Sequence, residues 1–147
     1  MGALPTGAAA SRAALLLALA VPAALLGGAY ISQYVFGLWP CEMCWWQRYP
    51  HFAALGFAAL AYVVPARSRI LVALAAMSII ASGLIGGCHA GVEYRWWQGL
   101  TACTAPAAPD AGGSALDAIL NAPLVRCDQV QWQLFGISLA GYNFLIS

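Results

Sequence analysis

Long apolar segments with few or no charged residues dominate this chain of 147 residues. Three of them, at about residues 13–36, 46–64 and 70–89, each hold about 20 residues or more. A helix rises about 1.5 Å per residue, so about 20 apolar residues cross a hydrocarbon core of roughly 30 Å. We therefore predict three membrane-spanning helices at these positions.

The first apolar segment could also be read as a cleaved signal peptide. Arg12 precedes a stretch rich in alanine and leucine, and small residues occur near Gly27. The apolar core of a signal peptide is usually only about 7–15 residues long. We therefore favour a membrane-spanning helix, in which Pro22 is tolerated because neighbouring helices satisfy the freed carbonyl group.

Two of the predicted helices depart from a regular membrane span: one in where it begins and the other in its length. Proline disfavours helical geometry at the residue before it, so Pro50 predicts that the second helix begins irregularly, at about residue 46. The last apolar segment, at about residues 130–147, is short for a membrane span. We predict it as a fourth helix that either leaves the bilayer early or is a truncated part of a longer helix.

Four spans place two loops, at about residues 37–45 and 91–129, on the same side of the membrane. All six tryptophans lie in or beside these loops, as expected of aromatic residues at a membrane surface. They are Trp39, Trp45, Trp46, Trp96, Trp97 and Trp132. The predicted fold is an all-α membrane protein, a four-transmembrane-helix bundle that forms one integral membrane domain over residues 1–147.

The composition agrees with a membrane location. Hydrophobic residues make up 63% of the chain and charged residues 7%, which leaves too few charges for the surface of a soluble domain. The six basic residues are all arginines and are scattered, so no basic stripe could bind nucleic acid. The connector at residues 65–69 carries two of these arginines, which favours the cytoplasmic side for it.

Five cysteines give the chain its chemistry. Cys41, Cys44, Cys103 and Cys127 fall in the two loops, and Cys88 ends the third predicted helix. Disulfides persist in oxidising compartments, so these loops are expected to face the periplasm. The first two cysteines form a CxxC pair, a spacing that suits thiol–disulfide exchange.

Other roles are open to these four cysteines: two inert structural disulfides, a zinc site of four thiolates, or haem attachment. Haem attachment requires histidine directly after the second cysteine, where Trp45 stands. Zinc sites usually have compact ligand pairs, whereas Cys103 and Cys127 are 24 positions apart and no second CxxC occurs. Redox exchange is favoured, structural disulfides come next, and we predict no metal site.

Several motifs are distinctive in combination. They are WPCEMCWWQRYP at 39–50, CHAGVEYRWW at 88–97, CDQVQW at 127–132 and FGISLAGYNF at 135–144. Together with Cys103 they resemble the disulfide bond formation protein B family, from the first predicted helix to the last residue. The short last helix departs from the usual length in that family.

The resemblance implies a thiol:quinone oxidoreductase of the bacterial inner membrane. Its partner would be a periplasmic thioredoxin-fold thiol oxidase resembling disulfide bond formation protein A. The reduced partner would attack a Cys103–Cys127 disulfide, most readily at Cys103. Cys127 would then react with Cys41, and Cys44 would pass the electrons to ubiquinone or menaquinone from the membrane pool.

The resemblance also implies that Arg48 and His89 border the quinone. From the residues alone, His89 is better read as an interfacial histidine bonded to a carbonyl group. Glu93 is read as a solvated acid at the membrane surface or as a helix-end partner rather than a proton donor. Gln47 either packs or donates a hydrogen bond to quinone, and Cys88 packs as a small hydrophobe. Two alternatives share these motifs: a related quinone-linked oxidoreductase with a dedicated partner, and a non-enzymatic membrane scaffold with two structural disulfides.

Overall fold

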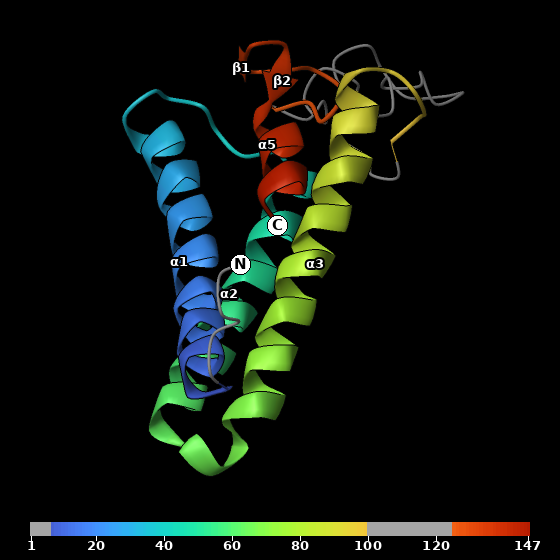
Figure 1. The fold of residues 1–147 in the computed structure, drawn as a ribbon. Coiled ribbons are helices and arrows are strands. Elements are labelled where there is room, and N and C mark those ends of the chain that lie inside the picture. The colour runs from blue at the N-terminus through green and yellow to red at the C-terminus, as the bar shows by residue number, and fades with distance from the viewer. Residues whose placement is uncertain (1–6, 100–124) are drawn as a thin grey trace, which may run out of the picture.

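The computed structural model describes residues 7–99 and 125–147, and this part of the chain is mostly helical. Its elements are α1 (Gly7–Tyr34), α2 (Glu42–Val63), the short 3-10 helix η1 (Pro65–Arg67), α3 (Ser68–Glu93), β1 (Gln133–Leu134), β2 (Ile137–Ser138) and α5 (Leu139–Ile146). Helices α2 and α3 form an antiparallel pair joined through η1, and α5 lies beside α3 near the opposite end of that pair (Figure 1).

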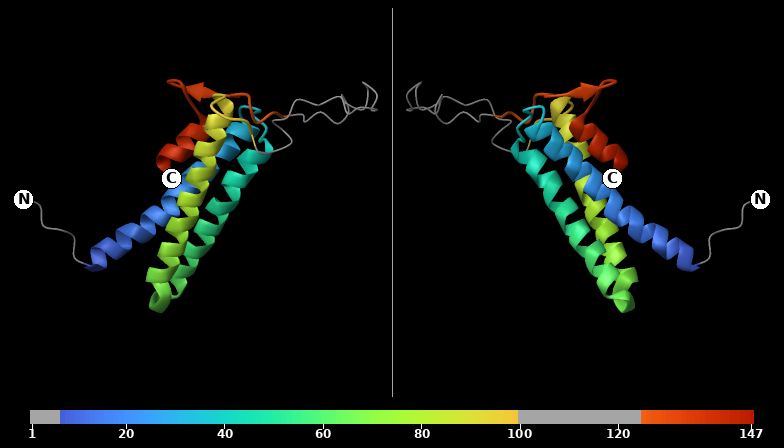
Figure 2. Two further views of the ribbon diagram at one scale, coloured as in Figure 1. Left: turned by 90° about the vertical axis from the view of Figure 1, so that its right-hand side faces the viewer. Right: turned by 90° about the vertical axis from the view of Figure 1, so that its left-hand side faces the viewer.

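Small side chains allow α1, α2 and α3 to pack closely. Buried alanines from all three helices meet the larger side chain of Ile79 in one cluster, a composition typical of helix contacts inside membranes. The alanines are Ala18, Ala54, Ala58 and Ala75. The N-terminal end of α1 turns away from the α2–α3 pair in Figure 2, and its opposite end stands apart from the pair in Figure 1, so the three helices pack around the middle of α1, at Ala18.

Within the described residues, two helical segments are long and apolar enough to cross a membrane: residues 11–34 and residues 65–93. They correspond to the first and third predicted spans. The first contains Pro22, whose side chain is fully buried, and it continues as one helix through this residue.

The prediction of an irregular start for α2 was wrong. The helix begins at Glu42, four residues before the predicted position, and continues through Pro50. Cys41 caps it: the Cys41 Sγ atom accepts a hydrogen bond from the backbone N–H of Cys44. Proline removes one backbone hydrogen bond from the helix, and the packing of α2 against α1 and α3 outweighs that loss.

The prediction of a helix over residues 130–147 was also wrong in its first half. Strands β1 and β2 pair antiparallel there, and α5 is only eight residues long. The two residues between the strands, Phe135 and Gly136, both have positive φ, as in the two-residue turns that suit hairpins. Ser138 then caps α5, because its Oγ accepts a hydrogen bond from the N–H of Gly141.

Glycines of α3 let α5 approach it. A Cβ atom at Gly86 would lie 2.9 Å from the Ala140 carbonyl oxygen, so only glycine fits there without moving α5. At the end of α3, the Tyr94 hydroxyl donates to the Gly136 carbonyl and accepts from the Ser138 N–H. These contacts hold α5 and the hairpin over the end of the bundle where the cysteines lie.

Candidate thiol–disulfide site

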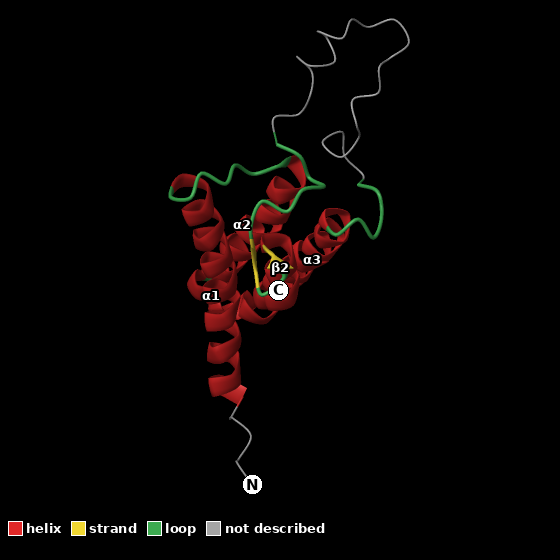
Figure 3. Ribbon diagram, turned by 90° about the horizontal axis from the view of Figure 1, so that it is seen from above, coloured by secondary structure: helices red, strands yellow, loops and turns green. Residues whose placement is uncertain are grey.

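The candidate site is a largely apolar cavity of about 170 Å³ at the hairpin end of the bundle. Viewed from above, β2 and the C-terminal helix lie between α1 and α3 (Figure 3). Helices α1, α2, α3 and α5 and the segment after Cys127 all contribute to the walls. The polar groups facing it include Cys41, Cys44, Arg48, His51 and His89.

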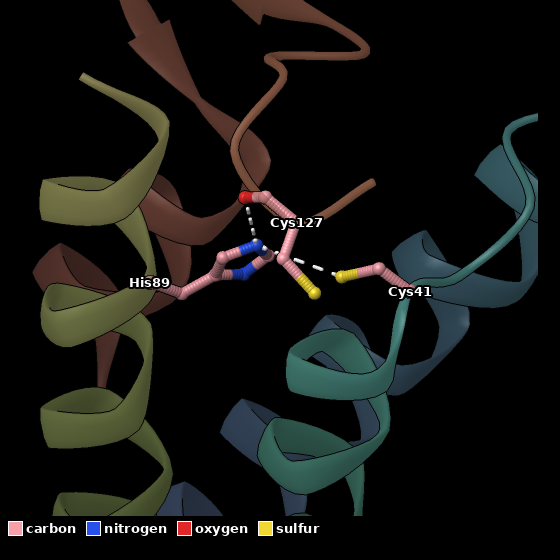
Figure 4. A group of neighbouring side chains, drawn as sticks. All are labelled: Cys41, His89 and Cys127. Atoms are coloured by element: carbon pink, nitrogen blue, oxygen red, sulfur yellow. Dashed lines mark hydrogen bonds between the residues drawn. The ribbon is translucent and has the colours of Figure 1, made fainter. Parts of the chain in front are cut away.

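Three sulfur atoms lie close together at this site. The Sγ atoms of Cys41 and Cys44 are 2.9 Å apart, because the helix cap and the first turn of α2 bring them to the same end of the helix. The reactive atoms of Cys41, His89 and Cys127 lie within 4.8 Å of one another. Figure 4 shows the sulfur atoms of Cys41 and Cys127 pointing toward each other. The sulfur of Cys41 is therefore close to both of the others.

The three sulfur atoms differ in oxidation state. Cys41 and Cys44 are free thiols, whereas the fully buried Cys127 is disulfide-bonded. Cys88 is also a free thiol. Cys103 lies outside the described residues. The site thus holds a dithiol directly beside a disulfide.

The Cys41 thiol keeps its proton in this arrangement. Its hydrogen bond to the Cys44 sulfur and its burial raise the pKa of Cys41 well above the usual value, and the backbone N–H of Cys44 opposes this only in part. The Cys41 thiol therefore donates and the Cys44 sulfur accepts. Negative charge is thus expected on Cys44, the sulfur nearer to Arg48 along α2.

A chain of hydrogen bonds fixes the orientation of His89. The Asn143 amide nitrogen donates to the Ser82 carbonyl oxygen, which can only accept, and to the Gln47 Oε1 atom. The Gln47 amide nitrogen must then donate to the Nδ1 atom of His89, at 2.8 Å. The proton of the His89 ring is therefore on Nε2.

This Nε2 proton points at the sulfur atoms. The His89 Nε2 atom donates to the backbone oxygen of Cys127 at 3.2 Å and lies 3.6 Å from the Cys41 Sγ atom. One side chain thus holds the segment of Cys127 against the cap of α2. Its neighbour Glu93, 4.0 Å from His89, has a side chain only 8% exposed, so the solvated-acid reading of Glu93 was wrong and the reading as a partner at the helix end remains.

Arg48 is a buried cation on the cavity wall. Its guanidinium donates to Gln33 Oε1 at 2.7 Å and to the Ala29 carbonyl oxygen at 3.3 Å, and it lies 4.9 Å from the ring centres of Tyr30 and Trp45. None of the described carboxylates lies within ion-pair distance of it. A buried cation held only by neutral groups and ring faces is available to an electron-rich ligand.

A salt bridge connects the residues on either side of Cys127. Arg126 donates to both carboxylate oxygens of Asp128, at 2.8 and 2.6 Å. This contact lowers the pKa of Asp128 and raises that of Arg126. The pair joins the two residues that flank the buried cysteine.

Cys41, His89 and Cys127 could together be read as a metal site, since each offers one ligand atom. Metal binding requires thiolates, and the sulfur of Cys127 is held in a disulfide. The His89 Nε2 atom carries a proton and bonds to a carbonyl oxygen, as derived above. The arrangement suits sulfur exchange better than metal binding.

The structure thus brings together Cys41, Cys44, Cys127, Arg48 and His89, five of the six predicted site residues. The prediction that Cys88 packs as a small hydrophobe was wrong, since its side chain is exposed. Sequence reasoning left the role of Gln47 open and missed the other buried polar groups. The missed residues are Gln33, His51, Ser82, Ser138 and Asn143.

One signal in the sequence could have found His51. It follows Cys44 by seven residues and Arg48 by three, the spacing of one helix face. Because α2 continues through Pro50, His51 lies on the same helix as Cys44 and Arg48.

These features define a class of protein: a mostly helical chain with membrane-length helices that carries a dithiol and a disulfide in contact at one end. Comparison with known proteins gives the family. The sequence model described as disulfide bond formation protein DsbB matches residues 11–147, and the chain belongs to this family. The resemblance predicted from the motifs is confirmed, and with it a role in disulfide bond formation.

Individual relatives agree with the family assignment. A disulfide bond formation protein B of Verminephrobacter eiseniae is 32% identical over 91% of this chain and 77% of its own length. One of Aromatoleum aromaticum is 32% identical over 92% of this chain and 84% of its own length. An uncharacterised protein of Rickettsia prowazekii is 24% identical over 83% of this chain and 73% of its own. No solved structure matches the chain.

Proposed function

We propose that this chain is a membrane thiol:quinone oxidoreductase. It would reoxidise a periplasmic thioredoxin-fold disulfide donor and pass the electrons through two cysteine pairs to a respiratory quinone. The observation that carries the proposal is the position of the Cys41 sulfur, 2.9 Å from the sulfur of Cys44 and within 4.8 Å of that of Cys127.

These distances suit thiol–disulfide exchange. A disulfide bond is about 2.05 Å long, so the sulfurs of Cys41 and Cys127 need to approach by at most about 2.8 Å to form one. Side-chain rotation covers this distance without moving a helix. Cys41 can therefore be bonded in turn to Cys44 and to Cys127.

The electrons would move in three exchanges. The dithiol of the partner attacks a Cys103–Cys127 disulfide, most readily at Cys103, and leaves as a disulfide. The freed Cys127 thiolate attacks Cys41 in a Cys41–Cys44 disulfide, and Cys44 leaves as a thiolate. The Cys103 thiolate then restores the Cys103–Cys127 disulfide and releases Cys41. The described state, with Cys41 and Cys44 as thiols beside an oxidised Cys127, follows the third exchange.

The residues around the cavity fit a quinone. A quinone supplies an acceptor for two electrons and two protons, which leaves Cys41 and Cys44 as a disulfide. The cavity is largely apolar, as a quinone ring and its tail require. Arg48 offers a cation that stabilises negative charge both on Cys44 and on a bound oxygen. His89 holds Cys127 beside the dithiol.

The membrane arrangement is part of the proposal. Helix α1 and the segment 65–93 would span the bacterial inner membrane, with α2 returning between them and α5 packed against α3 within the membrane. The loops at about 37–45 and 91–129 would face the periplasm, where a soluble partner can reach Cys103. The short connector with Arg67 and Arg69 would face the cytoplasm.

Two alternatives make different predictions. A scaffold with two structural disulfides would keep its cysteines oxidised and would transfer no electrons. A related oxidoreductase with a dedicated partner would reduce quinone in the same way but would accept electrons from that partner alone. The site geometry favours exchange over a scaffold, because inert disulfides do not require a dithiol in contact with a disulfide.

The test is quinone reduction by the purified chain in lipid nanodiscs, with ubiquinone-1 as acceptor and a reduced thioredoxin-fold disulfide donor as electron source. Cys44→Ser removes the sulfur that faces Arg48, so the rate is expected to fall to background. This variant has no Cys41–Cys44 disulfide for the Cys127 thiolate to attack, so Cys103 and Cys127 should remain as thiols after reaction with the donor, which mass spectrometry of alkylated peptides detects. Cys88→Ala is the matched control and should retain most of the activity, since the Cys88 side chain is exposed and does not line the cavity.

Ubiquinone-1 reduction by Cys44→Ser at the wild-type rate would refute the proposal. So would loss of all activity in a folded Cys88→Ala protein. Failure of the unaltered chain to reduce ubiquinone-1 with any thiol donor would favour the scaffold.

A further inference from the structure

His51 is a second histidine at the cavity, and the thiol chemistry does not use it. It lies on α2 three residues after Arg48, is only 3% exposed, and faces the same cavity as Cys44 and Arg48. Its Nδ1 atom is buried and lacks a hydrogen-bond partner among the described residues. Buried polar atoms are nearly always paired, so an unpaired one in a cavity wall points to a ligand.

The protonation of His51 follows from the same hydrogen-bond chain that orients His89. The Asn143 amide nitrogen is directed to the Ser82 carbonyl oxygen, so the Asn143 Oδ1 atom must face the other way. That oxygen lies 2.9 Å from the Nε2 atom of His51 and can only accept. Neutral His51 therefore carries its proton on Nε2, and its Nδ1 atom is a bare lone pair.

A bare lone pair discriminates between two forms of one ligand. A quinone ring has two carbonyl oxygens, which accept hydrogen bonds and cannot donate. The corresponding hydroquinone has two hydroxyl groups, which donate. Arg48 can donate to either form, whereas His51 in its neutral form can bond only to a hydroxyl group.

We propose that the Nδ1 atom of His51 accepts a hydrogen bond from a hydroxyl group of the hydroquinone and so makes the cavity bind the reduced form more tightly than the oxidised one. This inference rests on the proposed function and adds a residue to it. Tighter binding of the product favours electron transfer from the dithiol within the site. Asn143 is then a positioning residue, because it fixes the tautomer of His51.

Two substitutions separate the roles of the two ring nitrogens. The side-chain oxygen of asparagine takes the place of Nδ1, because both atoms are bonded to Cγ. The amide of glutamine extends one atom further and takes the place of Nε2. His51→Asn therefore keeps the acceptor toward the cavity, and His51→Gln keeps the contact with Asn143 and loses the acceptor.

The experiment measures dissociation constants of ubiquinol-1 and ubiquinone-1 by quenching of tryptophan fluorescence in nanodiscs. All variants carry Cys44→Ser, so that no electrons are exchanged during the titration. A hydrogen bond worth about 0.5–1.5 kcal/mol changes affinity by a factor of about 2 to 13. We expect His51→Gln to lower the preference for ubiquinol-1 by this factor and His51→Asn to keep it. The opposite order, with the preference lost in His51→Asn alone, would mean that His51 acts only through Asn143, and it would overturn the proposal.

A second measurement needs no substitution at His51. The chain has only two histidines, and the Nδ1 atom of His89 already accepts from Gln47. In the ¹⁵N spectrum of the labelled full chain, one ring nitrogen should therefore have the shift of a bare lone pair. Ubiquinol-1 should move this signal and ubiquinone-1 should not. A signal that ubiquinol-1 leaves unmoved at saturation would overturn the proposal even if neither variant folds.

The two levels of inference fail in different ways. If the unaltered chain reduces ubiquinone-1 but binds both forms equally, only the role of His51 is wrong. If it neither binds nor reduces ubiquinone-1, the proposed function fails and takes this inference with it.

Discussion

Asn143 holds the polar interior of the site together, and replacing it with leucine is expected to destabilise the whole bundle. Its side chain is 8% exposed and joins α5 to α2 and α3 through three groups. The Oδ1 atom accepts from His51 at 2.9 Å, and the amide nitrogen donates to Gln47 at 2.9 Å and to the Ser82 carbonyl oxygen at 3.1 Å. Leucine has a similar shape and none of these hydrogen bonds.

The size of the effect follows from the groups left without partners. Asn143→Leu leaves the Nε2 proton of His51 and the Oε1 atom of Gln47 unpaired, while Ser82 keeps its bond to the Gln47 carbonyl oxygen. Each buried unpaired group costs about 1–3 kcal/mol, so the free energy of unfolding should fall by about 2–6 kcal/mol. For a chain of this size that corresponds to a decrease in Tm of roughly 5–20 °C.

The assay is thermal unfolding in detergent, followed by near-ultraviolet circular dichroism. Tyr142→Phe is the matched control one residue away, since its hydroxyl donates to the Leu134 carbonyl oxygen at an exposed position. The control should change the free energy of unfolding by less than about 0.5 kcal/mol. An Asn143→Leu protein that unfolds within about 2 °C of the control would refute the hydrogen-bond chain, and with it the derived tautomers of both histidines.

Two further predictions concern Arg48 and the contact between α3 and α5. Arg48→Ala removes the cation beside Cys44, a charge-assisted contact worth about 1.5–3 kcal/mol, so the rate of ubiquinone-1 reduction should fall roughly ten- to a hundredfold. Disulfide exchange with the donor in a single turnover without quinone should change much less, and equal losses in both assays would place Arg48 outside the quinone step. Gly86→Ala puts a Cβ atom 2.9 Å from the Ala140 carbonyl oxygen, so α5 must shift and the free energy of unfolding should drop by about 1–3 kcal/mol. Gly56→Ala meets no atom within 4 Å and should leave Tm unchanged or raise it, so similar losses in the two glycine variants would contradict the close approach of α5.

The helices in the first two thirds of the chain were predicted better than the structure of its last 18 residues. The helices at 7–34 and 68–93 include the predicted spans 13–36 and 70–89 almost completely, because long uncharged apolar segments have few other stable states in a bilayer. The first half of the helix predicted at residues 130–147 was wrong. Their apolar character is that of a helix, and only the positive φ angles of Phe135 and Gly136 turn the first part into a hairpin.

The sequence by itself determined the helical character of the chain, the grouping of its cysteines near one end, and the family to which it belongs. These follow from local patterns: uncharged length, the CxxC spacing and short motifs. Only the tertiary structure decided which polar side chains share the cavity. Asn143 meets His51 and Gln47 across 92 and 96 positions of sequence, and no local pattern encodes such a contact. The Ser82 carbonyl oxygen on α3 orients the amide of Asn143, which holds the proton of His51 on Nε2 and leaves Nδ1 as a lone pair. Contacts of this kind depend on how the helices pack, because buried donors and acceptors must find partners there.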